Sequence, residues 1–303
     1  MLVDEIKKFC VINSFTYNGQ GGNSAAVFSN QGKLEDSIMQ NIARQLNLVE
    51  TVYITESDEE GIDFDIRYFT PESEVGIAGH PTVAAFIALA KEGVLGAIIK
   101  DKYLIKTKDG IKEVSIEERN NDIVVKLKQQ IVEFGPIIQE KCKIAEILGI
   151  DNEDIMNDLP IQCINTGLGH LVVPIKSLEG LMRVKRNINQ LRNLCNLVGV
   201  REVQVFCFET KDDTFDIHTR NICPREGIED AACGIGNAAV GAYLLNNYYS
   251  DRKMISIKAE QGYIVKVPCA IDIYAYRERN DIVVQIGGTG KVIIQGDFII
   301  SNI

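Results

Sequence analysis

The most unusual hydrophobic pattern in the chain occurs twice, and in both places it predicts a buried helix. Residues 82–90 read TVAAFIALA and residues 237–245 read NAAVGAYLL, so small or apolar side chains occupy every face of the helical turn. A surface helix keeps one polar face, whereas a helix that is apolar all round is buried. We therefore expect two central helices, each enclosed by other parts of the fold.

The rest of the pattern predicts mainly short strands. In the first half, β-branched and aromatic residues lie between polar breaks in residues 9–15, 24–28, 52–55, 64–69, 103–107, 113–116 and 123–127. Apolar stripes at helical spacing in residues 38–46 and 188–195 predict two amphipathic helices. One enclosed helix and about seven strands per half predict an α+β fold, in which a curved, mostly antiparallel sheet or barrel wraps around the central helix.

The two halves of the sequence also match each other in order. Three pairs of segments correspond: residues 37–53 with 187–205, residues 69–85 with 222–239, and residues 118–125 with 278–284. The offset grows from 149 residues between Leu48 and Leu197 to 159 residues between Ile123 and Ile282. Small insertions after an ancient duplication produce such a gradual increase, whereas solenoid repeats have periods of about 20 to 50 residues.

This repeat predicts two domains related by a pseudo-twofold axis. We place the N-terminal barrel-like domain at residues 1–135 and the C-terminal one at residues 136–303, with a linker within residues 136–160. The C-terminal strands can cross over to the first domain. The length of 303 residues agrees with two domains of roughly 150 residues each.

Composition narrows the classes of function. Hydrophobic residues make up 46% of the chain and charged residues 24%, as in ordinary globular proteins. Without a secretory leader or an apolar run of roughly 18 residues, we expect a cytoplasmic protein that does not associate with membranes. The formal net charge of −10 argues against a nucleic-acid partner. The eight cysteines form no C-x-x-C pair, so we expect neither a metal site nor a disulfide framework.

Each apolar helix begins at a glycine, and this predicts an anion site. The sequences are Ala78-Gly79-His80 in the first half and Cys233-Gly234-Ile235 in the second. The first N–H groups of a helix have no partner within the helix, and the helix dipole adds positive potential there. We therefore expect Gly79 and Gly234 to bind the carboxylate of a small metabolite.

Landmarks along most of the chain resemble the phenazine-biosynthesis PhzF-like family, which has the diaminopimelate epimerase fold. They are GNSAAVF at residues 22–28, LVETVY at residues 48–53, FTPESEVGIAGHP at residues 69–81, and Glu229-Asp230 ahead of Cys233-Gly234. The resemblance implies two barrel-like sheets, each around a central helix, with a site in the cleft between them that needs no cofactor.

The resemblance also implies roles for particular residues. The catalytic glutamate of the family maps to Glu50, its histidine to His80 and its second-half aspartate to Asp230. A carboxylate whose pKa is raised by a dry site can move a proton between carbon atoms, so Glu50 is the expected acid/base. The expected substrate-binding residues are Asn23, Gly79, Cys233, Gly234 and Ile235.

Two departures from the family pattern bear on the substrate and on the chemistry. Ser24 stands where the family has proline, and Cys233-Gly234-Ile235 stands where it has Thr-Gly-Ser, so a polar contact to the phenazine precursor is lost. Cys233 is similar to the second catalytic cysteine of diaminopimelate epimerases and proline racemases, although Ala78 takes the place of the first. At a helix N-terminus its thiol is expected to have a lowered pKa.

Simpler interpretations remain for each candidate. Glu50 can be a solvated charge at a strand edge, His80 a helix-capping or core histidine, and Asp230 a cap of the following helix. Cys233 can be a small buried residue that fills space in the core. The other histidines, His170 and His218, lie in strand-like runs and are expected to be structural.

We therefore predict an isomerase or epimerase without a cofactor that moves a proton on a small carboxylate-bearing metabolite. The alternatives are a cysteine-dependent racemase or dehydratase that uses Cys233, and a carboxylate-binding protein without catalysis.

In the second half, the Val198-Gly199 region is the expected counterpart of Glu50 and carries no carboxylate. Alternating residues at 281–290 suggest strands that pair between the subunits of a homodimer.

Overall fold

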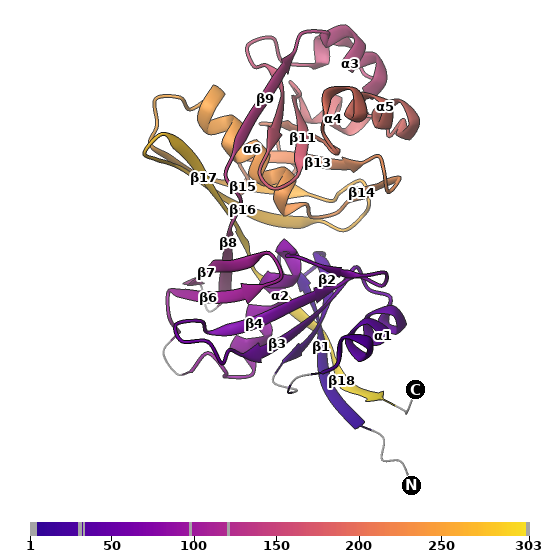
Figure 1. Cartoon of the computed structure of the whole chain (residues 1–303). Helices are drawn as coiled ribbons and strands as arrows, with labels where there is room; N and C mark the ends of the chain where they lie inside the picture. Colours follow the sequence, from indigo (N-terminus) through magenta and orange to yellow (C-terminus); the bar gives the residue numbers. More distant parts are fainter. Residues whose placement is uncertain (1–4, 30–31, 33, 97–98, 120–121, 301–303) are drawn as a thin grey trace. The chain divides into compact units, whose positions relative to one another are not determined.

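The computed structural model describes residues 5–29, 32, 34–96, 99–119 and 122–300, which fall into two compact units (Figure 1). Unit 1 comprises residues 1–127 and 288–303, and unit 2 comprises residues 128–287. The first boundary precedes residue 135, and the C-terminal segment packs with unit 1. The two ancestral domains at residues 1–135 and 136–303 stay a prediction. Residues 1–4, 120 and 121, which the sequence analysis used, lie outside the described residues.

Both units combine a large mixed sheet with few helices, which confirms the α+β architecture. The elements of unit 1 are β1 (Glu5–Ser14), β2 (Asn23–Ser29), α1 (Asp36–Leu46), β3 (Glu50–Glu56), β4 (Phe64–Phe69), β5 (Glu74–Val75), α2 (Gly79–Lys91), β6 (Lys102–Thr107), β7 (Gly110–Arg119), β8 (Asp122–Lys128) and β18 (Gly290–Ile300). Strands β2 and β3 are parallel, as are β4 and β6, whereas β1 with β18, β1 with β2, β3 with β4, β4 with β5, β6 with β7, and β7 with β8 are antiparallel.

Helix α2 is the enclosed helix that the sequence predicts for unit 1. Every residue from Pro81 to Leu89 is buried, and the helix packs on β1, β2, β3 and β18. Each large side chain in it, such as the fully buried Phe86, stabilises the fold by about 1.5–3 kcal/mol. This burial holds the N-terminus of α2 at a fixed place among the strands.

Unit 2 has a similar succession of strands and a central helix, with α3 (Lys141–Leu148), the 3₁₀ helix η1 (Asn152–Asp154) and α4 (Leu178–Arg183) as additional helices. Its other elements are β9 (Glu133–Ile138), β10 (Ile161–Asn165), β11 (Gly169–Pro174), α5 (Ile188–Val198), β12 (Glu202–Cys207), β13 (Ile217–Cys223), β14 (Ile228–Asp230), α6 (Gly234–Asn247), β15 (Met254–Gln261), β16 (Cys269–Glu278) and β17 (Asp281–Gly288). Strands β11 and β12 are parallel, as are β13 and β15, and the other pairs are antiparallel. Helix α6 is buried from Gly236 to Leu245 against β10, β11, β12, β15 and β16.

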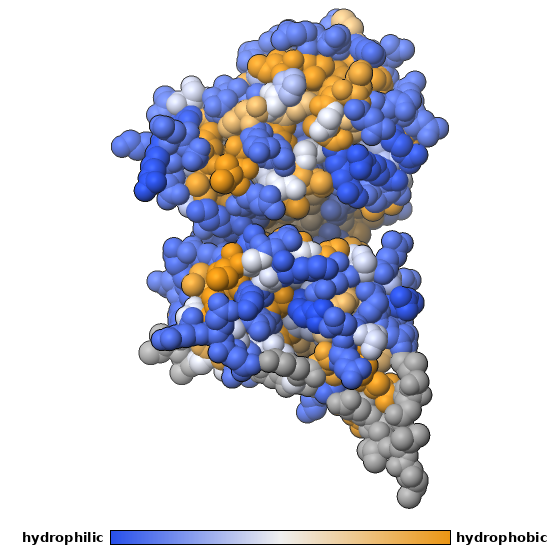
Figure 2. Space-filling model, viewed as in Figure 1, coloured by the Kyte–Doolittle hydropathy of each residue, from blue (hydrophilic) through white to orange (hydrophobic). Residues whose placement is uncertain are grey.

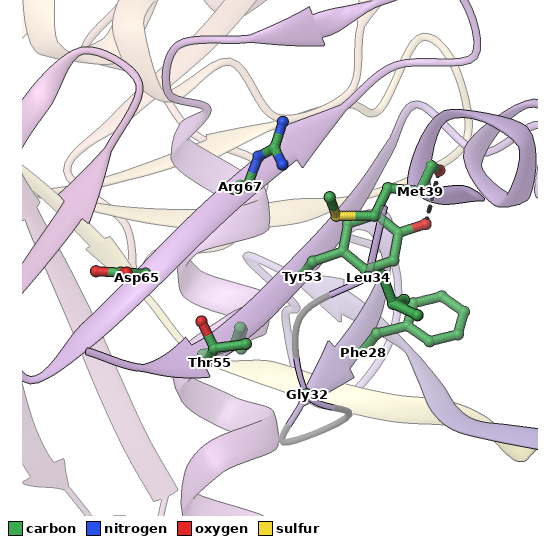
Figure 3. A pocket seen from close by; sticks show the side chains of 9 residues that line it. Phe28, Gly32, Leu34, Met39, Tyr53, Thr55, Asp65 and Arg67 are labelled. Carbon is green, nitrogen blue, oxygen red and sulfur yellow. Dashed lines mark hydrogen bonds between the residues drawn. The ribbon is translucent and has the colours of Figure 1, made fainter. Parts of the chain in front are cut away.

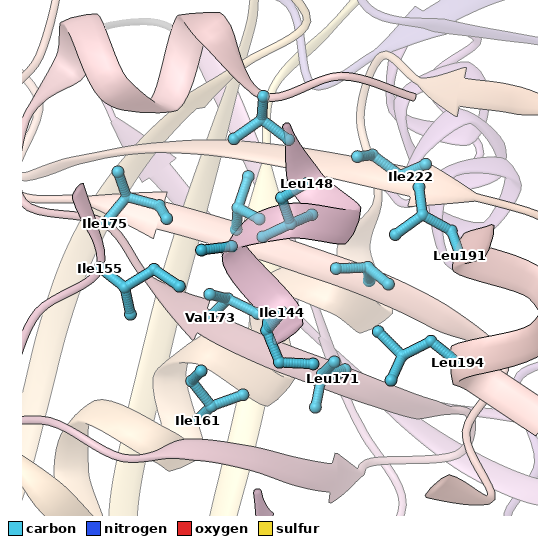
Figure 4. Packing of buried hydrophobic residues seen from close by; sticks show 14 of the residues in the cluster. Ile144, Leu148, Ile155, Ile161, Leu171, Val173, Ile175, Leu191, Leu194 and Ile222 are labelled. Atoms are coloured by element: carbon cyan, nitrogen blue, oxygen red, sulfur yellow. The ribbon is translucent and has the colours of Figure 1, made fainter. Parts of the chain in front are cut away.

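The other helices of unit 2 pack on a second apolar layer (Figure 4). Ile144 and Leu148 of α3 and Leu191 and Leu194 of α5 belong to one cluster with Leu171 of β11. In unit 1, α1 makes the corresponding layer against β2 and β3. Strands β11 and β12 are therefore largely apolar, and their buried polar side chains are His170 and Glu202 near the strand starts and Gln204 within β12.

The face of the surface in view is mainly hydrophilic (Figure 2). Hydrophilic side chains cover most of the face seen in Figure 2, with apolar patches between them. Among the helices in the described part of the chain, none is both long and apolar enough to cross a bilayer.

Candidate active site

Glu50 and His80 form a close pair in unit 1. Glu50 is the first residue of β3, and His80 lies in the first turn of α2. His80 Nε2 lies 3.1 Å from Glu50 Oε2, and the two side chains are 11% and 14% exposed. The fold therefore brings together two of the three predicted catalytic residues, in a setting that is largely but not fully shielded from water.

The first turn of α2 is fixed by hydroxyl groups. Ser14 Oγ donates a hydrogen bond to the carbonyl oxygen of His80 (2.6 Å), and Thr82 Oγ1 donates to the carbonyl oxygen of Ala78 (2.7 Å). A side-chain Cβ added at Gly79 would meet no atom within 4 Å. The N-terminal N–H groups of α2 are thus held in place beside open space, as an anion site requires.

Asn23 lies at the same end of the sheet. It begins β2 two residues before Ala25, and Ala25 is the register partner of Glu50. The turn before it requires Gly22, which has a φ of +89° and whose added Cβ would lie 2.5 Å from a backbone oxygen of β1. Ser24, at the position where the resemblance implies proline, donates a hydrogen bond from Oγ to Asn13 Oδ1 (2.6 Å). Proline has no hydroxyl with which to make this bond.

In unit 2, Asp230 ends β14 just before α6. Its Oδ1 accepts a hydrogen bond from the backbone N–H of Ala232 (2.9 Å), and its carbonyl accepts one from Gln261 Nε2 (2.8 Å). The N-cap of α6 is Cys233, whose Sγ accepts from Gly236 N–H (3.2 Å). The simpler interpretation of Asp230 as the helix cap is therefore wrong. Gly234 and Ile235, the next two residues, are half-buried.

The expectation of a lowered pKa for Cys233 is also wrong. Burial raises the pKa of this thiol well above its ordinary value, and the negative charges of Asp230 and Glu202 raise it further. The hydrogen bond from Gly236 N–H lowers the pKa, but its effect is smaller. Desolvation of the thiolate therefore outweighs the helix N-terminus, and Cys233 stays protonated near neutral pH.

Glu202, which was not among the predicted site residues, lies beside Cys233. Glu202 Oε2 is 3.0 Å from His170 Nε2, 3.9 Å from Cys233 Sγ, and accepts a hydrogen bond from Asn221 Nδ2 (3.2 Å). Burial alone would raise the pKa of Glu202, but the hydrogen bonds from His170 and Asn221, with the attraction of His170, outweigh it, so the pKa is lowered.

Glu202, and not the Val198-Gly199 region, is the counterpart of Glu50. Glu50 begins the strand that runs parallel to β2, and Glu202 begins the strand that runs parallel to β11. The sequence did contain a sign of this, because Glu202-Val203-Gln204-Val205 follows the amphipathic helix of the second half as Glu50-Thr51-Val52-Tyr53 follows that of the first. Insertions between helix and strand obscured the match.

The third histidine pairs with a different acid. His218 Nδ1 lies 2.6 Å from Glu260 Oε1, and both side chains are fully buried. This agrees with a structural role for His218.

A pocket in unit 1 lies apart from these residues (Figure 3). It is a cavity of about 250 Å³, and Tyr53 at its wall donates a hydrogen bond to the carbonyl oxygen of Met39 (2.8 Å). Its lining consists of Phe28, Gly32, Leu34, Met39, Tyr53, Ile54, Thr55, Asp65 and Arg67. None of the predicted site residues contributes to this lining.

Similarity to known proteins shows the enzyme class of this chain. The chain is 33% identical over 296 residues to an uncharacterised isomerase of Clostridium acetobutylicum, covering 96% of this chain and 97% of that protein. It is 27% identical to the trans-2,3-dihydro-3-hydroxyanthranilate isomerase of Pseudomonas aeruginosa, over 78% of this chain and 79% of that enzyme. The protein is an enzyme of the isomerase class.

The family follows from the same comparison. Residues 12–296 match the family described as "Phenazine biosynthesis-like protein", and the chain belongs to this PhzC-PhzF family. The crystal structure of a PhzF-family protein of Bacillus anthracis superposes with a TM-score of 0.86 at 26% identity, covering 97% of this chain and 99% of that one. The resemblance and the fold class inferred from the sequence are thus confirmed.

Proposed function

We propose that this enzyme moves a proton on a small carboxylate-bearing metabolite, with Glu50 as the acid/base and without a cofactor. The observation that carries the proposal is the 3.1 Å contact between Glu50 Oε2 and His80 Nε2 at the N-terminus of the buried helix α2. Membership of an isomerase family supports it.

The contacts suggest different roles for Glu50, His80 and the N-terminal N–H groups of α2. A carboxylate within hydrogen-bond reach of a carbon-bound proton removes it as a general base and returns it as a general acid. Glu50 takes this role. His80 lies against the carboxylate and donates a hydrogen bond to the substrate, while the N–H groups that begin α2 stabilise negative charge on the substrate.

Residues of both units are assigned to substrate binding. We propose that Asn23 and Gly79 contact the substrate from unit 1. Asp230 accepts a hydrogen bond from a substrate amine or hydroxyl, and the start of α6 at Cys233, Gly234 and Ile235 contributes to binding. These assignments rest on the family resemblance. Because Ile235 has no hydroxyl, we propose a substrate other than the phenazine precursor.

The alternatives are weaker. A racemase that uses Cys233 needs a thiolate, and burial raises the pKa of this thiol. A carboxylate-binding protein without catalysis would keep the helix N-termini but would have no need of the Glu50–His80 contact.

The test is Glu50→Gln, followed by incorporation of solvent deuterium into candidate substrates. The first candidates are analogues of trans-2,3-dihydro-3-hydroxyanthranilate that lack its hydroxyl group, and that compound itself is the comparison that we expect to react poorly. We expect a loss of at least about 100-fold in exchange rate, the usual contribution of one acid/base group. Glu56→Gln, at the exposed end of the same strand, is the matched control. Unchanged exchange in Glu50→Gln with an active substrate would exclude the proposed role.

We further propose a cytoplasmic homodimer. The alternating segment behind the dimer expectation contains β17, which pairs with β16 and whose Val284 carbonyl accepts a hydrogen bond from Gln129 N–H (2.9 Å), so this strand is not a free edge and the dimer rests on the sequence pattern alone. Light scattering at micromolar concentration tests the proposal, and a monomeric mass contradicts it.

A further inference from the structure

We propose that unit 2 contains a transition-metal site of the zinc class, formed by His170, Glu202 and Cys233. The three residues come from β11, β12 and the N-cap of α6. Their ligand atoms Nε2, Oε2 and Sγ all lie within 4.8 Å of one another, and all three residues are buried. Neither the family relationship nor the role proposed for Glu50 accounts for this cluster.

The separations of the donor atoms match a tetrahedral site closely. His170 Nε2 is 3.0 Å from Glu202 Oε2, and Cys233 Sγ is 3.9 Å from both atoms. Zinc bonds of about 2.3 Å to sulfur and about 2.1 Å to nitrogen or oxygen separate tetrahedral neighbours by roughly 3.4–3.6 Å. Side-chain movements of a few tenths of an ångström therefore suffice to place one ion in contact with all three donors.

The direction of the histidine distinguishes a metal site from a catalytic triad. In a triad, one ring nitrogen faces the nucleophile and the other faces the acid. Here Nε2 of His170 faces both Cys233 and Glu202, while Nδ1 lies 2.9 Å from the carbonyl oxygen of Leu168. A hydrogen bond from the second ring nitrogen to a backbone carbonyl is the usual support of a metal-bound histidine.

The other two donors are also held by hydrogen bonds. Asn221 Nδ2 donates to Glu202 Oε2 (3.2 Å), and Gly236 N–H donates to Cys233 Sγ (3.2 Å). A thiolate and a carboxylate neutralise a divalent cation, which buried surroundings require. Sulfur, imidazole and one carboxylate favour zinc over magnesium or calcium.

Binding of the ion would connect three parts of unit 2. It would link β11 and β12 to the first turn of α6, and it would remove the thiol of Cys233 from acid/base chemistry. Three protein ligands leave the fourth tetrahedral position to water or to a small anion.

Cobalt titration of the metal-free full-length protein tests the site, because thiolate coordination to Co²⁺ gives a near-ultraviolet charge-transfer band. We expect one equivalent of Co²⁺ to develop this band and one equivalent of Zn²⁺ to abolish it. Cys233→Ala should lose the band, and His170→Ala should weaken binding at least tenfold. Cys142→Ser, which changes an exposed cysteine, should leave both unchanged.

Two further measurements keep the result interpretable. Alanine is the natural N-cap at the equivalent position of α2, so Cys233→Ala should fold, and circular dichroism checks this. Saturating Zn²⁺ should raise the melting temperature of the natural protein but not that of Cys233→Ala. The proposal is overturned if no equivalent of Co²⁺ binds, or if the folded Cys233→Ala protein keeps the charge-transfer band.

Discussion

Arg220 fixes β14, the strand that carries Asp230, so replacing Arg220 should lower the free energy of unfolding strongly. The guanidinium is 2% exposed, and it donates from Nε and Nη2 to the two carboxylate oxygens of Glu229 (2.9 Å each). Nη1 donates to the carbonyl oxygens of Leu181 (2.7 Å) and Val184 (2.9 Å). Glu229 directly precedes Asp230 in β14, so one buried arginine links β14 to the C-terminal end of α4.

Arg220→Met keeps much of the side-chain volume but leaves the Glu229 carboxylate buried without its bidentate partner. Breaking a buried pair in this way costs about 3–5 kcal/mol. For a unit of this size, that loss lowers the melting temperature by about 6–20 °C. Replacement of both partners, Arg220→Met with Glu229→Met, removes the unpaired charge, so we expect the double variant to recover part of the loss.

The assay is thermal unfolding of the two single variants and the double variant, followed by circular dichroism. The reasoning requires the double variant to lose clearly less stability than the sum of the single losses. If the three losses are additive, or if Arg220→Met unfolds within about 0.5 kcal/mol of the natural protein, which is the spread of neutral surface changes, the ion pair does not hold β14.

Three other predictions follow from individual contacts. Iodoacetamide at neutral pH should modify the exposed Cys142 first and leave Cys233 unmodified in the folded protein, because burial raises the pKa of the Cys233 thiol; mass spectrometry of the peptides checks this. The hydrogen bond from Arg67 lowers the pKa of Glu74, so the ionised carboxylate stabilises the folded state. The natural protein should therefore be more stable than Glu74→Gln above about pH 4.3, and this difference should disappear as the pH falls through the folded-state pKa of Glu74. Melting temperatures of both proteins measured across this pH range check this. Gly241→Ala should cost about 1–3 kcal/mol in urea unfolding, because its Cβ would lie 2.4 Å from a side-chain carbon of β16.

The fold could be predicted because its strongest feature is local. A helix that is apolar on every face has to be enclosed, and α2 and α6 are buried where residues 82–90 and 237–245 predict them. The parallel pairs β2 with β3 and β11 with β12 could not be read from the pattern, because parallel and antiparallel strands of this length share the same periodicity. The return of residues 288–303 to unit 1 likewise depends on long-range pairing.

Only part of the candidate site could be predicted from the sequence. Residues near the start of a central helix were found, since glycine and the family landmarks identify such positions, and Glu50 does lie beside His80. The cluster of His170, Glu202 and Cys233 was missed because its members come from three elements 31 or more residues apart. The pKa of Cys233 was mispredicted because a sequence reveals a helix N-terminus but not how deeply it is buried.

The two glutamates that begin β3 and β12 show how equivalent strands can serve different chemistry. Each lies within 3.1 Å of a histidine, but His80 comes from the helix and His170 from the neighbouring strand. His170 is fully buried, and its hydrogen bond helps to lower the pKa of Glu202. Such a carboxylate is a poor proton acceptor, since efficient general bases have a pKa near the working pH. Glu50 and His80 keep some exposure, so a substrate can reach them, and this asymmetry favours Glu50 for proton transfer and leaves Glu202 to bind a cation.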